Sequence, residues 1–264
     1  LKVGIPTLRL DEVMNKLKNK VAIVTGASKG IGASIAKYFA AEGAKVIVNY
    51  ASSKEGAEKV VTNITENGGT AIAIKADVSK ATEVSQLFEE TKNAFGQIDI
   101  LVNNAGIYQF SPIETFSEDS FHQQFNTNVL GSLLTITEAV KQFDEKGGVI
   151  INISSGASTT PLAMMSVYSA TKAALDAITI SLSKEFSGRN IRINSLLPGG
   201  VQTEGTITAG ITGSDAEKAM ISKTPLGRIG QPEDIAKVAV FLASDDAGWI
   251  TGEKITVAGG LYGL

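Results

Sequence analysis

The chain has 264 residues, 43% of them hydrophobic and 19% charged, which is enough to bury one large core. A formal net charge of -3, with lysines and arginines scattered along the chain, gives no basic surface for nucleic acid. With no cysteine and one histidine, His122, the chain lacks thiolate chemistry and multi-histidine metal sites, so we expect no metal ion. No apolar run reaches the roughly 20 residues that span a bilayer, so we expect a cytoplasmic protein without membrane contacts.

From residue 20 onward, short β-branched runs alternate with helical patterns. The pattern predicts strands at 21–25, 45–50, 71–76, 99–104, 149–155, 191–198 and 253–260, and helices at 31–42, 53–67, 80–95, 117–143, 167–187 and 232–244. Continuous apolar strands separated by helices are typical of a parallel sheet covered on both faces. The sequence therefore predicts an α/β, doubly wound Rossmann-type sheet of about seven strands in a single domain over residues 16–264.

Two segments do not fit this alternation. Residues 1–15 belong to neither a strand nor an obvious core, and Met14 resembles a natural start, so we expect an artificial leader or a mobile N-terminal extension. Residues 203–225 are rich in Gly, Thr, Ser and Ala and contain one short helical piece, D-A-E-K-A-M-I-S. This composition indicates a mobile lid.

The first motif that carries chemistry is T-G-A-S-K-G-I-G, residues 25–32, after the first strand and at the start of a helix. Its glycines at 26, 30 and 32 allow a tight turn and let an anion approach the main chain. The free N–H groups at a helix N-terminus favour a pyrophosphate. Glycines alone would fit an ordinary turn, but the flanking strand and helix favour a dinucleotide site.

Two further motifs end later strands. N-N-A-G, residues 103–106, follows the fourth strand, and Ser154 and Ser155 follow the fifth. On the next helix Tyr168 stands four residues before Lys172, so an ammonium would lie beside a phenol and make it a usable acid. Taken singly, these residues also fit a turn, a helix cap and a solvated helix face.

Together with P-G-G-V-Q-T at 198–203, these motifs resemble the short-chain dehydrogenase/reductase family over residues 16–264. The resemblance implies a catalytic set of Asn128, Ser155, Tyr168 and Lys172. The family serine lies 13 residues before the tyrosine, which selects Ser155 over Ser154. The resemblance implies that Tyr168 exchanges the proton of the carbonyl or alcohol oxygen and that Ser155 hydrogen-bonds this oxygen. Lys172 would support the phenol and hold the nicotinamide ribose, and Asn128 would anchor a water beside Lys172.

The resemblance also implies the residues that bind the cofactor: Gly26, Ser28, Lys29, Gly30, Ile31, Gly32, Tyr50, Ser52, Ser53, Asp77, Val78, Asn104, Ala105, Gly106, Tyr168, Lys172, Pro198, Gly199, Val201 and Thr203. We expect NADP(H), because Tyr50 occupies the position that carries Asp in NAD-using relatives and no carboxylate is present to repel a 2′-phosphate. Lys29, Ser52 and Ser53 can instead bind this phosphate, and Asp77 would face the adenine amine.

The resemblance fixes the reaction type, and we expect reduction of a medium-sized ketone or aldehyde. The walls of the substrate pocket are predicted to be apolar, with Ile107, Tyr108, Leu162, Met164 and Met165. The resemblance further implies a homotetramer that pairs through the helices at 117–143 and 167–187 and through the C-terminal strand.

Three alternatives remain open. A 3-oxoacyl-[acyl-carrier-protein] reductase is suggested by the run T-P-L-G-R-I-G-Q-P-E-D-I-A at 224–236, with Lys146 and Arg189 as candidate carrier contacts that also fit a plain surface. A sugar oxidation like that of glucose dehydrogenase is the second. The third is a dinucleotide sensor without turnover, which would have no need to keep Tyr168.

Overall fold

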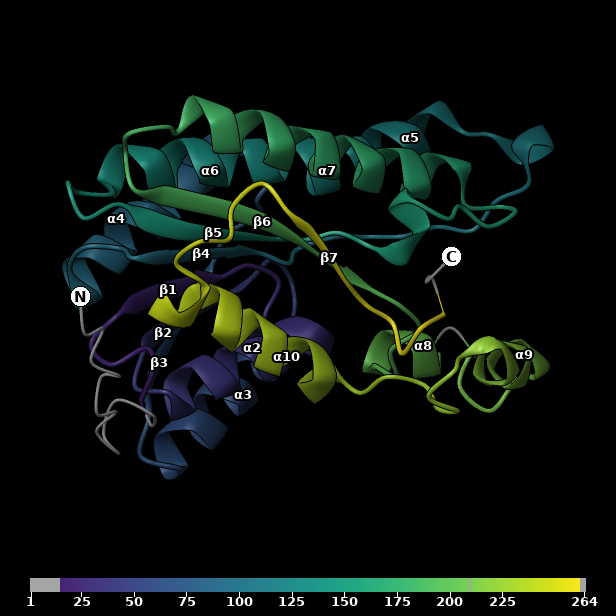
Figure 1. Ribbon diagram of the computed structural model, residues 1–264, viewed down its shortest axis with the longest axis horizontal. Coiled ribbons are helices and arrows are strands. Elements are labelled where there is room, and N and C mark those ends of the chain that lie inside the picture. The colour runs from purple at the N-terminus through teal and green to yellow at the C-terminus, as the bar shows by residue number, and fades with distance from the viewer. Residues whose placement is uncertain (1–14, 209, 262–264) are drawn as a thin grey trace, which may run out of the picture.

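The computed structural model describes residues 15–208 and 210–261 (Figure 1). Its strands form one parallel sheet of seven in the order β3-β2-β1-β4-β5-β6-β7. The strands are β1 (Val21–Val24), β2 (Lys45–Tyr50), β3 (Thr70–Lys75), β4 (Ile100–Asn103), β5 (Gly148–Ile153), β6 (Ile191–Pro198) and β7 (Lys254–Val257). The order reverses between β1 and β4, which is the switch point of a doubly wound sheet. The predicted fold class is confirmed, with every strand boundary within three residues of the expected one.

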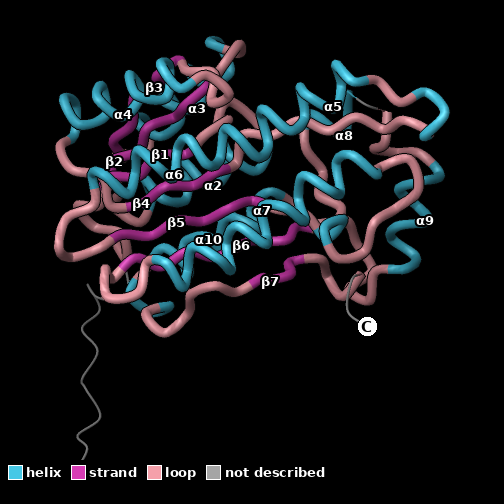
Figure 2. Tube along the Cα trace, turned by 90° about the horizontal axis from the view of Figure 1, so that it is seen from above, coloured by secondary structure: helices cyan, strands magenta, loops and turns pink. Residues whose placement is uncertain are grey.

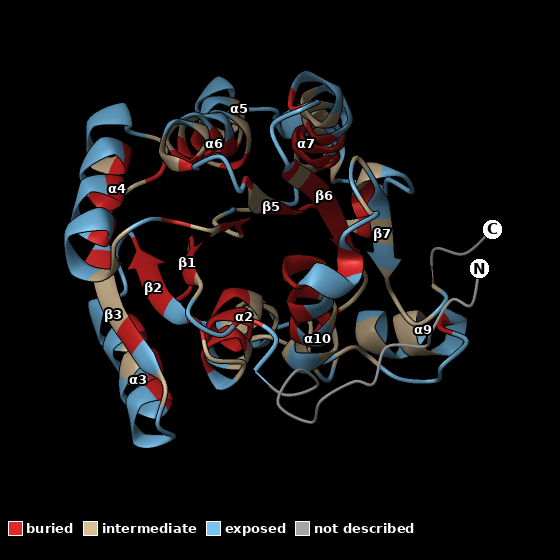
Figure 3. Ribbon diagram, turned by 60° about the vertical axis from the view of Figure 1, so that its left-hand side comes forward, coloured by how far each residue is buried: buried red, intermediate tan, exposed pale blue. Residues whose placement is uncertain are grey.

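The helices cover both faces of the sheet (Figure 1). One face carries α2 (Gly30–Ala41), α3 (Lys54–Glu66) and α10 (Pro232–Ala243), and the other carries α4 (Ala81–Phe95), α6 (Gly131–Gln142) and α7 (Ser166–Glu185). All four residues of β1 are buried, because its side chains meet helices on both sides. Phe39 of α2 and Phe88 of α4 are fully buried in the two halves of the core that the sheet separates. Figure 3 shows buried residues along the central strands and on the helices that cover them.

The prediction of one continuous helix at 117–143 is wrong, because the structure divides this segment into three elements. It consists of α5 (Glu118–Phe125), a single π-helical turn η2 (Asn126–Leu130), and α6 from Gly131. A π turn inserts one extra residue into the helical spacing and is often found at functional sites. Gly131 follows this turn at a close contact, since a Cβ there would lie 2.7 Å from a methyl of Val78.

Short elements gather at the carboxyl ends of the strands. In the segment expected to be a lid lie α8 (Glu204–Thr208) and α9 (Asp215–Lys223), at the same end of the molecule as α5 (Figure 1, Figure 2). Only α9 was predicted as a helical piece. The 3₁₀ turns η1 (Ile113–Thr115) and η3 (Gly156–Ser158) follow β4 and β5, whereas η4 (Asp245–Ala247) precedes β7. The N-terminal extension expected at 1–15 lies, apart from its last residue, outside the described residues.

Candidate active site

The end of β5 and the first turns of α7 bring three of the four predicted catalytic residues to one place. Tyr168 and Lys172 lie one helical turn apart on α7, and the Nζ atom of Lys172 is 5.7 Å from the centroid of the Tyr168 ring. Lys172 is 5% exposed, and its Nζ donates a hydrogen bond of 2.8 Å to the carbonyl oxygen of Ile153, the last residue of β5. Ser155 follows two residues later. An ammonium is thus held beside a phenol at a strand end.

The electrostatics of Lys172 reflect its position in the core. Burial lowers the pKa of Lys172 to about 8, and the negative charge of Asp176, one turn further along α7, acts in the opposite direction. The group therefore titrates within reach of neutral pH rather than near its usual value. A lysine in this state can change its charge when the surroundings of the site change.

Asn128 ties three segments together behind this pair. Its Oδ1 accepts from the N–H of Ile107 at 2.9 Å, while its Nδ2 donates to the carbonyl of Ile107 at 2.9 Å and to Oγ1 of Thr171 at 3.0 Å. Asn128 itself lies in the π turn and is buried. The sequence predicts a regular helix here, so the π turn that orients the Asn128 side chain was not predicted.

The two serines after β5 are used differently. Ser154 is buried, and its Oγ donates to the carbonyl of Lys172 at 3.2 Å. Ser155 is half-buried, and its Oγ accepts from the N–H of Ala157 at 3.1 Å, which leaves its hydroxyl proton available to another acceptor. Of the two, Ser155 is therefore the serine placed to meet a substrate.

The glycine-rich loop approaches the N-N-A-G segment at the switch point between β1 and β4. Gly26 has φ 60°, and a Cβ at this residue would lie 2.8 Å from the Cα of Ala105. A Cβ on Gly32 would overlap the side-chain nitrogen of Asn104, which donates to the carbonyls of Thr25 at 2.9 Å and Gly26 at 3.0 Å. Only glycine permits this close contact between the two segments.

The N-terminus of α2 contacts a carboxylate of the chain itself. The N–H of Gly30, the first residue of the helix, donates to Oε2 of Glu204 at 2.9 Å. Thr203 lies beside it, since a Cβ on Gly30 would be 3.4 Å from the Thr203 methyl. The Glu204 carboxylate stands in for a phosphate group at this helix N-terminus, so the residues present fit a pyrophosphate. Glu204 was not among the predicted site residues.

Residues predicted for the adenosine end surround the end of β2. Asn49, next to Tyr50, braces the glycine-rich loop, because its Oδ1 accepts from the N–H of Gly26 at 3.2 Å. Gly56 brings Ser28 and Ser53 together, since a Cβ there would lie 2.7 Å from Oγ of Ser53 and 2.8 Å from the carbonyl of Ser28. The side chains with open access at this end are those of Lys29, Ser52 and Ser53, whereas Tyr50 is 8% exposed.

Asp77 lies at the end of β3 with its carboxylate already engaged. Its Oδ1 accepts from the hydroxyl of Ser79 at 2.7 Å and from the N–H of Ser79 at 3.0 Å. Partial burial opposes ionisation, but the bonds from Ser79 and the charge of Lys80 outweigh it and hold the pKa of Asp77 below its usual value. Asp77 is therefore a charged hydrogen-bond acceptor at the rim of the site.

The remaining residues predicted to bind the cofactor make main-chain hydrogen bonds or pack in the core. The N–H of Gly199 donates to the carbonyl of Val257 at 3.1 Å, and Val201 forms a parallel bridge with Gly230. Val78 is buried against Gly131, so its side chain serves the core. The other positions border the places described above: Ile31, Gly106 and Pro198.

An apolar, partly aromatic wall adjoins Tyr168. The ring of Tyr108 meets that of Tyr168 edge-on at 6.2 Å between centroids, and meets Phe110 in the same way at 5.7 Å. Leu162 and Met164 are half-exposed on the facing loop. Met164 has a left-handed backbone, φ 66°, and its carbonyl accepts from the N–H of Ser111 at 2.9 Å, which joins the two walls.

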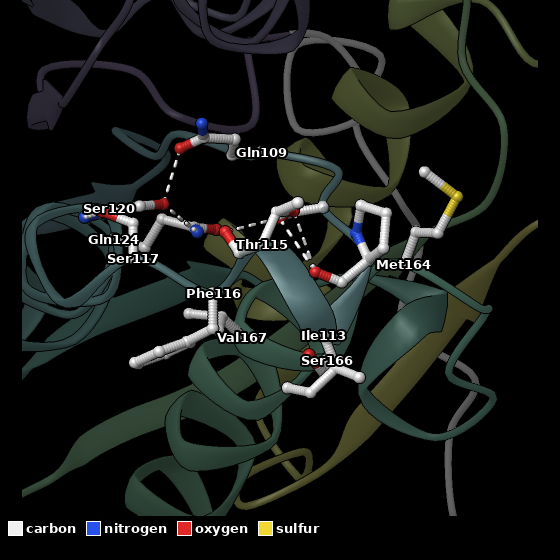
Figure 4. A pocket seen from close by; sticks show the side chains of 12 residues that line it. Gln109, Ile113, Thr115, Phe116, Ser117, Ser120, Gln124, Met164, Ser166 and Val167 are labelled. Carbon is white, nitrogen blue, oxygen red and sulfur yellow. Dashed lines mark hydrogen bonds between the residues drawn. The ribbon is translucent and has the colours of Figure 1, made fainter.

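A small pocket lies next to this wall without including the predicted catalytic residues (Figure 4). It holds about 40 Å³ and is lined by residues between Gln109 and Gln124 and by Met164, Ser166 and Val167. Ser120 donates to Oε1 of Gln109 at 2.6 Å and accepts from Nε2 of Gln124 at 3.3 Å. With space for a few waters only, this pocket is too small for a cofactor or a medium-sized substrate.

The fold and the site define a dinucleotide-binding α/β protein with a tyrosine–lysine pair. A family model described as enoyl-(acyl carrier protein) reductase matches residues 26–262, and the chain belongs to the short-chain dehydrogenase/reductase family of oxidoreductases. An uncharacterized oxidoreductase of Methylorubrum extorquens is 54% identical over 248 residues, which are 94% of this chain and 100% of that protein. Versicolorin reductase of Emericella nidulans is 38% identical over 256 residues, 94% of this chain and 97% of that protein.

Solved structures agree with this assignment. A short-chain dehydrogenase/reductase of Serratia marcescens has a TM-score of 0.88 and 35% identity, covering 94% of this chain and 99% of its own. The angucycline C-6 ketoreductase LanV with bound NADP has a TM-score of 0.87 and 33% identity, covering 94% and 97%. In the part of the chain described here, no helix combines the length and apolarity needed to cross a bilayer.

Proposed function

We propose that this oxidoreductase is an NADP(H)-dependent ketoreductase that reduces a medium-sized ketone or aldehyde. The observation that carries the proposal is the Tyr168 phenol held beside the buried ammonium of Lys172, at the strand end next to the glycine-rich loop. The apolar wall around Tyr108 supports a substrate with little charge. The named relatives include a versicolorin reductase and an angucycline ketoreductase.

The chain's own residues supply proton transfer and positioning. NADPH, when bound, supplies the hydride that forms the new C–H bond at the carbonyl carbon. Tyr168 donates its phenolic proton to the carbonyl oxygen, which becomes the hydroxyl of the product. Lys172 favours the phenolate that remains, because its positive charge lies beside the ring. The Ser155 hydroxyl donates a hydrogen bond to the same oxygen and stabilises the charge that develops there.

The remaining groups would replace the proton and hold the cofactor. Asn128 fixes the segment after β4 against α7. It would also anchor a water that links Lys172 to solvent. The N–H groups at the start of α2 and the hydroxyl of Thr203 would bind the pyrophosphate. Lys172 would also donate to the nicotinamide ribose. A cofactor held by these groups would lie across the switch point between β1 and β4.

We propose NADP(H) over NAD(H) because residues 49–53 contain no carboxylate that would repel a 2′-phosphate. Lys29, Ser52 and Ser53 are exposed around this position and can supply one charge and two hydroxyl donors. A charge-assisted contact contributes roughly 1.5–3 kcal/mol, about one to two orders of magnitude in preference.

The test of the cofactor is kcat/KM with NADPH and with NADH. The double variant Tyr50→Asp with Lys29→Ala is expected to move the preference towards NADH. Lys37→Ala is the matched control for Lys29→Ala, because Lys37 lies on α2 away from the N-terminus that Lys29 precedes. It should leave the ratio of the two kcat/KM values unchanged. A wild-type protein that uses NADH better than NADPH would contradict the proposal.

The test of the substrate is a panel of ketones, 3-oxoacyl thioesters and sugars, followed by absorbance of the reduced cofactor. Turnover of ketones without charged carriers supports the proposal. Preference for carrier-bound thioesters would instead support a 3-oxoacyl reductase, although the Arg189 guanidinium already donates to the carbonyl of Val140 at 2.9 Å. Turnover of sugars would support the glucose dehydrogenase-like activity. Binding of the cofactor with no turnover on the whole panel would identify a sensor.

We also propose that four copies assemble with dihedral symmetry. Leu130, Leu133 and Ile180 are partly exposed on η2, α6 and α7, the helices implied in pairing. Other apolar residues of these helices, Ile136 and Leu175, are instead buried in the core of the single chain. The surface left for pairing is therefore smaller than the sequence suggests.

A further inference from the structure

A buried carboxylate lies next to the catalytic pair and has no part in the mechanism above. Asp176 is 4% exposed, on the same face of α7 as Lys172 and one turn beyond it. Its Oδ2 accepts a hydrogen bond of 2.6 Å from the hydroxyl of Ser158, and its Oδ1 has no hydrogen-bond partner among the described residues. An acid in the core with one oxygen unsatisfied is costly, so its retention calls for a reason.

The bond to Ser158 reaches the turn that carries Ser155. Ser158 ends η3, and its N–H donates to the carbonyl of Ser155 at 3.0 Å. Tyr168 and Lys172 come from α7, whereas Ser155 comes from the loop after β5. The hydrogen bond between Ser158 and Asp176 joins the turn that follows Ser155 to α7 through two side chains. It therefore fixes the distance between the serine and the tyrosine that must meet one oxygen atom.

The negative charge of Asp176 acts on Lys172. We propose that Asp176 is a positioning residue of the active site, which ties the Ser155 turn to α7 and keeps a negative charge beside Lys172 so that its ammonium persists in the core. This inference rests on the proposed function, because it assigns a role around the same catalytic pair.

The charged and titratable groups that face Lys172 within the described chain are Tyr168 and Asp176, both on α7. Tyr108 adjoins Tyr168 edge-on. The neighbouring β5, η2 and η3 contain no titratable side chain. Titratable groups on other elements packed against α7 are exposed or bonded elsewhere: Glu118, Asp119 and His122 of α5, and Arg192 of β6, whose guanidinium donates to the main-chain carbonyl of Ser244. Removing the charge of Asp176 therefore leaves the ammonium without a counter-charge.

Two variants separate the effect of the Asp176 charge from that of the hydrogen bond between Asp176 and Ser158, which we call the tie. Asp176→Asn removes the charge but keeps an oxygen that can accept from Ser158. The Tyr168–Lys172 pair should then release its first proton at a pH lower by roughly one unit, since a neighbouring opposite charge shifts such groups by about that much or more. Ser158→Ala removes the tie and keeps the charge. Its kcat should fall by a similar factor at every pH, with the pH profile unmoved.

Measurements on the protein without cofactor come first. The Lys172 side chain is followed by heteronuclear NMR and the Tyr168 phenolate by ultraviolet absorbance, in the wild type, in Asp176→Asn and in Asp215→Asn. Asp215 is 97% exposed on α9, so its variant controls for the loss of one negative charge. We expect a shift to lower pH in Asp176→Asn alone. The same titration in Asp176→Asn and the wild type would overturn the charge role, whether or not the reductase activity is found.

Turnover gives the second readout. In ketone reduction the alkaline limb of kcat for Asp176→Asn should lie at lower pH, giving about tenfold less activity than the wild type above that limb and near-equal activity at acid pH. If Asp176→Asn does not fold by circular dichroism, Ser158→Ala still decides, because a kcat equal to that of the wild type overturns the tie. Wild-type protein without activity on any substrate would instead contradict the proposed function and leave the titration result standing.

Discussion

Tyr168 is the residue on which the proposed chemistry depends most directly. Tyr168→Phe removes only the hydroxyl, so the ring packing against Tyr108 and the fold should remain. We expect kcat to fall by roughly 10²–10⁴-fold, the usual contribution of a general acid, while the cofactor dissociation constant changes little. Stopped-flow turnover and calorimetric titration measure the two quantities. Near-normal reduction by this variant would rule out the tyrosine as the proton donor.

Gly26 can be tested against a glycine of similar conformation. Gly26 and Gly68 both have positive φ, 60° and 79°, but a Cβ on Gly26 meets Ala105 at 2.8 Å, whereas one on Gly68 has nothing within 4 Å. Gly68→Ala should cost only the backbone strain, about 1–2 kcal/mol of unfolding free energy. Gly26→Ala should cost more and should also weaken cofactor binding, because the two segments at the switch point must separate.

Denaturant unfolding and cofactor titration of both variants measure this difference. Equal losses of stability in the two variants would mean that the contact with Ala105 relaxes without cost.

Single residues were predictable from sequence where their signal is local. The spacing of Tyr168 and Lys172 places them one turn apart, and the structure has them side by side, with Lys172 buried and Tyr168 half-buried. Asp176 continues the same spacing, so a search for acids four residues after Lys172 would have found it. Glu204 had no such signal, because its contact with Gly30 joins positions 174 residues apart. Only the folded chain brings that carboxylate to the start of α2.

At the scale of elements, the start of α8 contacts the start of α2, at the N–H group for which we propose a contact with the pyrophosphate. Glu204, the first residue of α8, occupies the N–H of Gly30. Glu204→Gln removes the competing charge, so we expect the dissociation constant for NADPH to fall by about three- to tenfold, in line with the difference between charged and neutral hydrogen bonds. Isothermal titration calorimetry gives this constant.

The matched control for this variant is Glu217→Gln. Glu217 also accepts from a glycine N–H, that of Gly213 at 2.6 Å, but lies on α9. Its variant should bind NADPH like the wild type. Weaker binding by Glu204→Gln would show that Glu204 helps to hold the cofactor.

Element types followed from periodicity, and their interruptions did not. Strands such as β2, buried on both faces, appear as continuous apolar runs, and all seven were found. The π turn at Asn126–Leu130 changes the helical register by one residue, which a pattern averaged over 27 positions does not resolve. The cause lies in tertiary contacts, with Asn128 bonded to Ile107 and Gly131 pressed against Val78.

For the molecule as a whole, the expected assembly is a tetramer. Light scattering at micromolar concentration should give about four times the 27.6 kDa of one chain. Leu133→Glu places a charge on the exposed part of α6 and should reduce this mass. Thr62→Glu, at an exposed residue of α3 near the edge of the sheet opposite β7, should not. A monomeric mass for the wild type would refute the assembly.

The contact between β1 and β4 also bears on how the chain folds. Thr25 donates to the carbonyl of Val102 across 77 positions, and the N-N-A-G segment completes the glycine-rich loop from that distance. Closing so long a loop is entropically costly and makes folding slow. During synthesis, the glycine-rich loop emerges well before β4 (Ile100–Asn103), so the chain that precedes β4 contains no complete dinucleotide site. We therefore expect the cofactor to bind only after these two segments have joined, and to protect the folded protein against unfolding rather than to guide its formation.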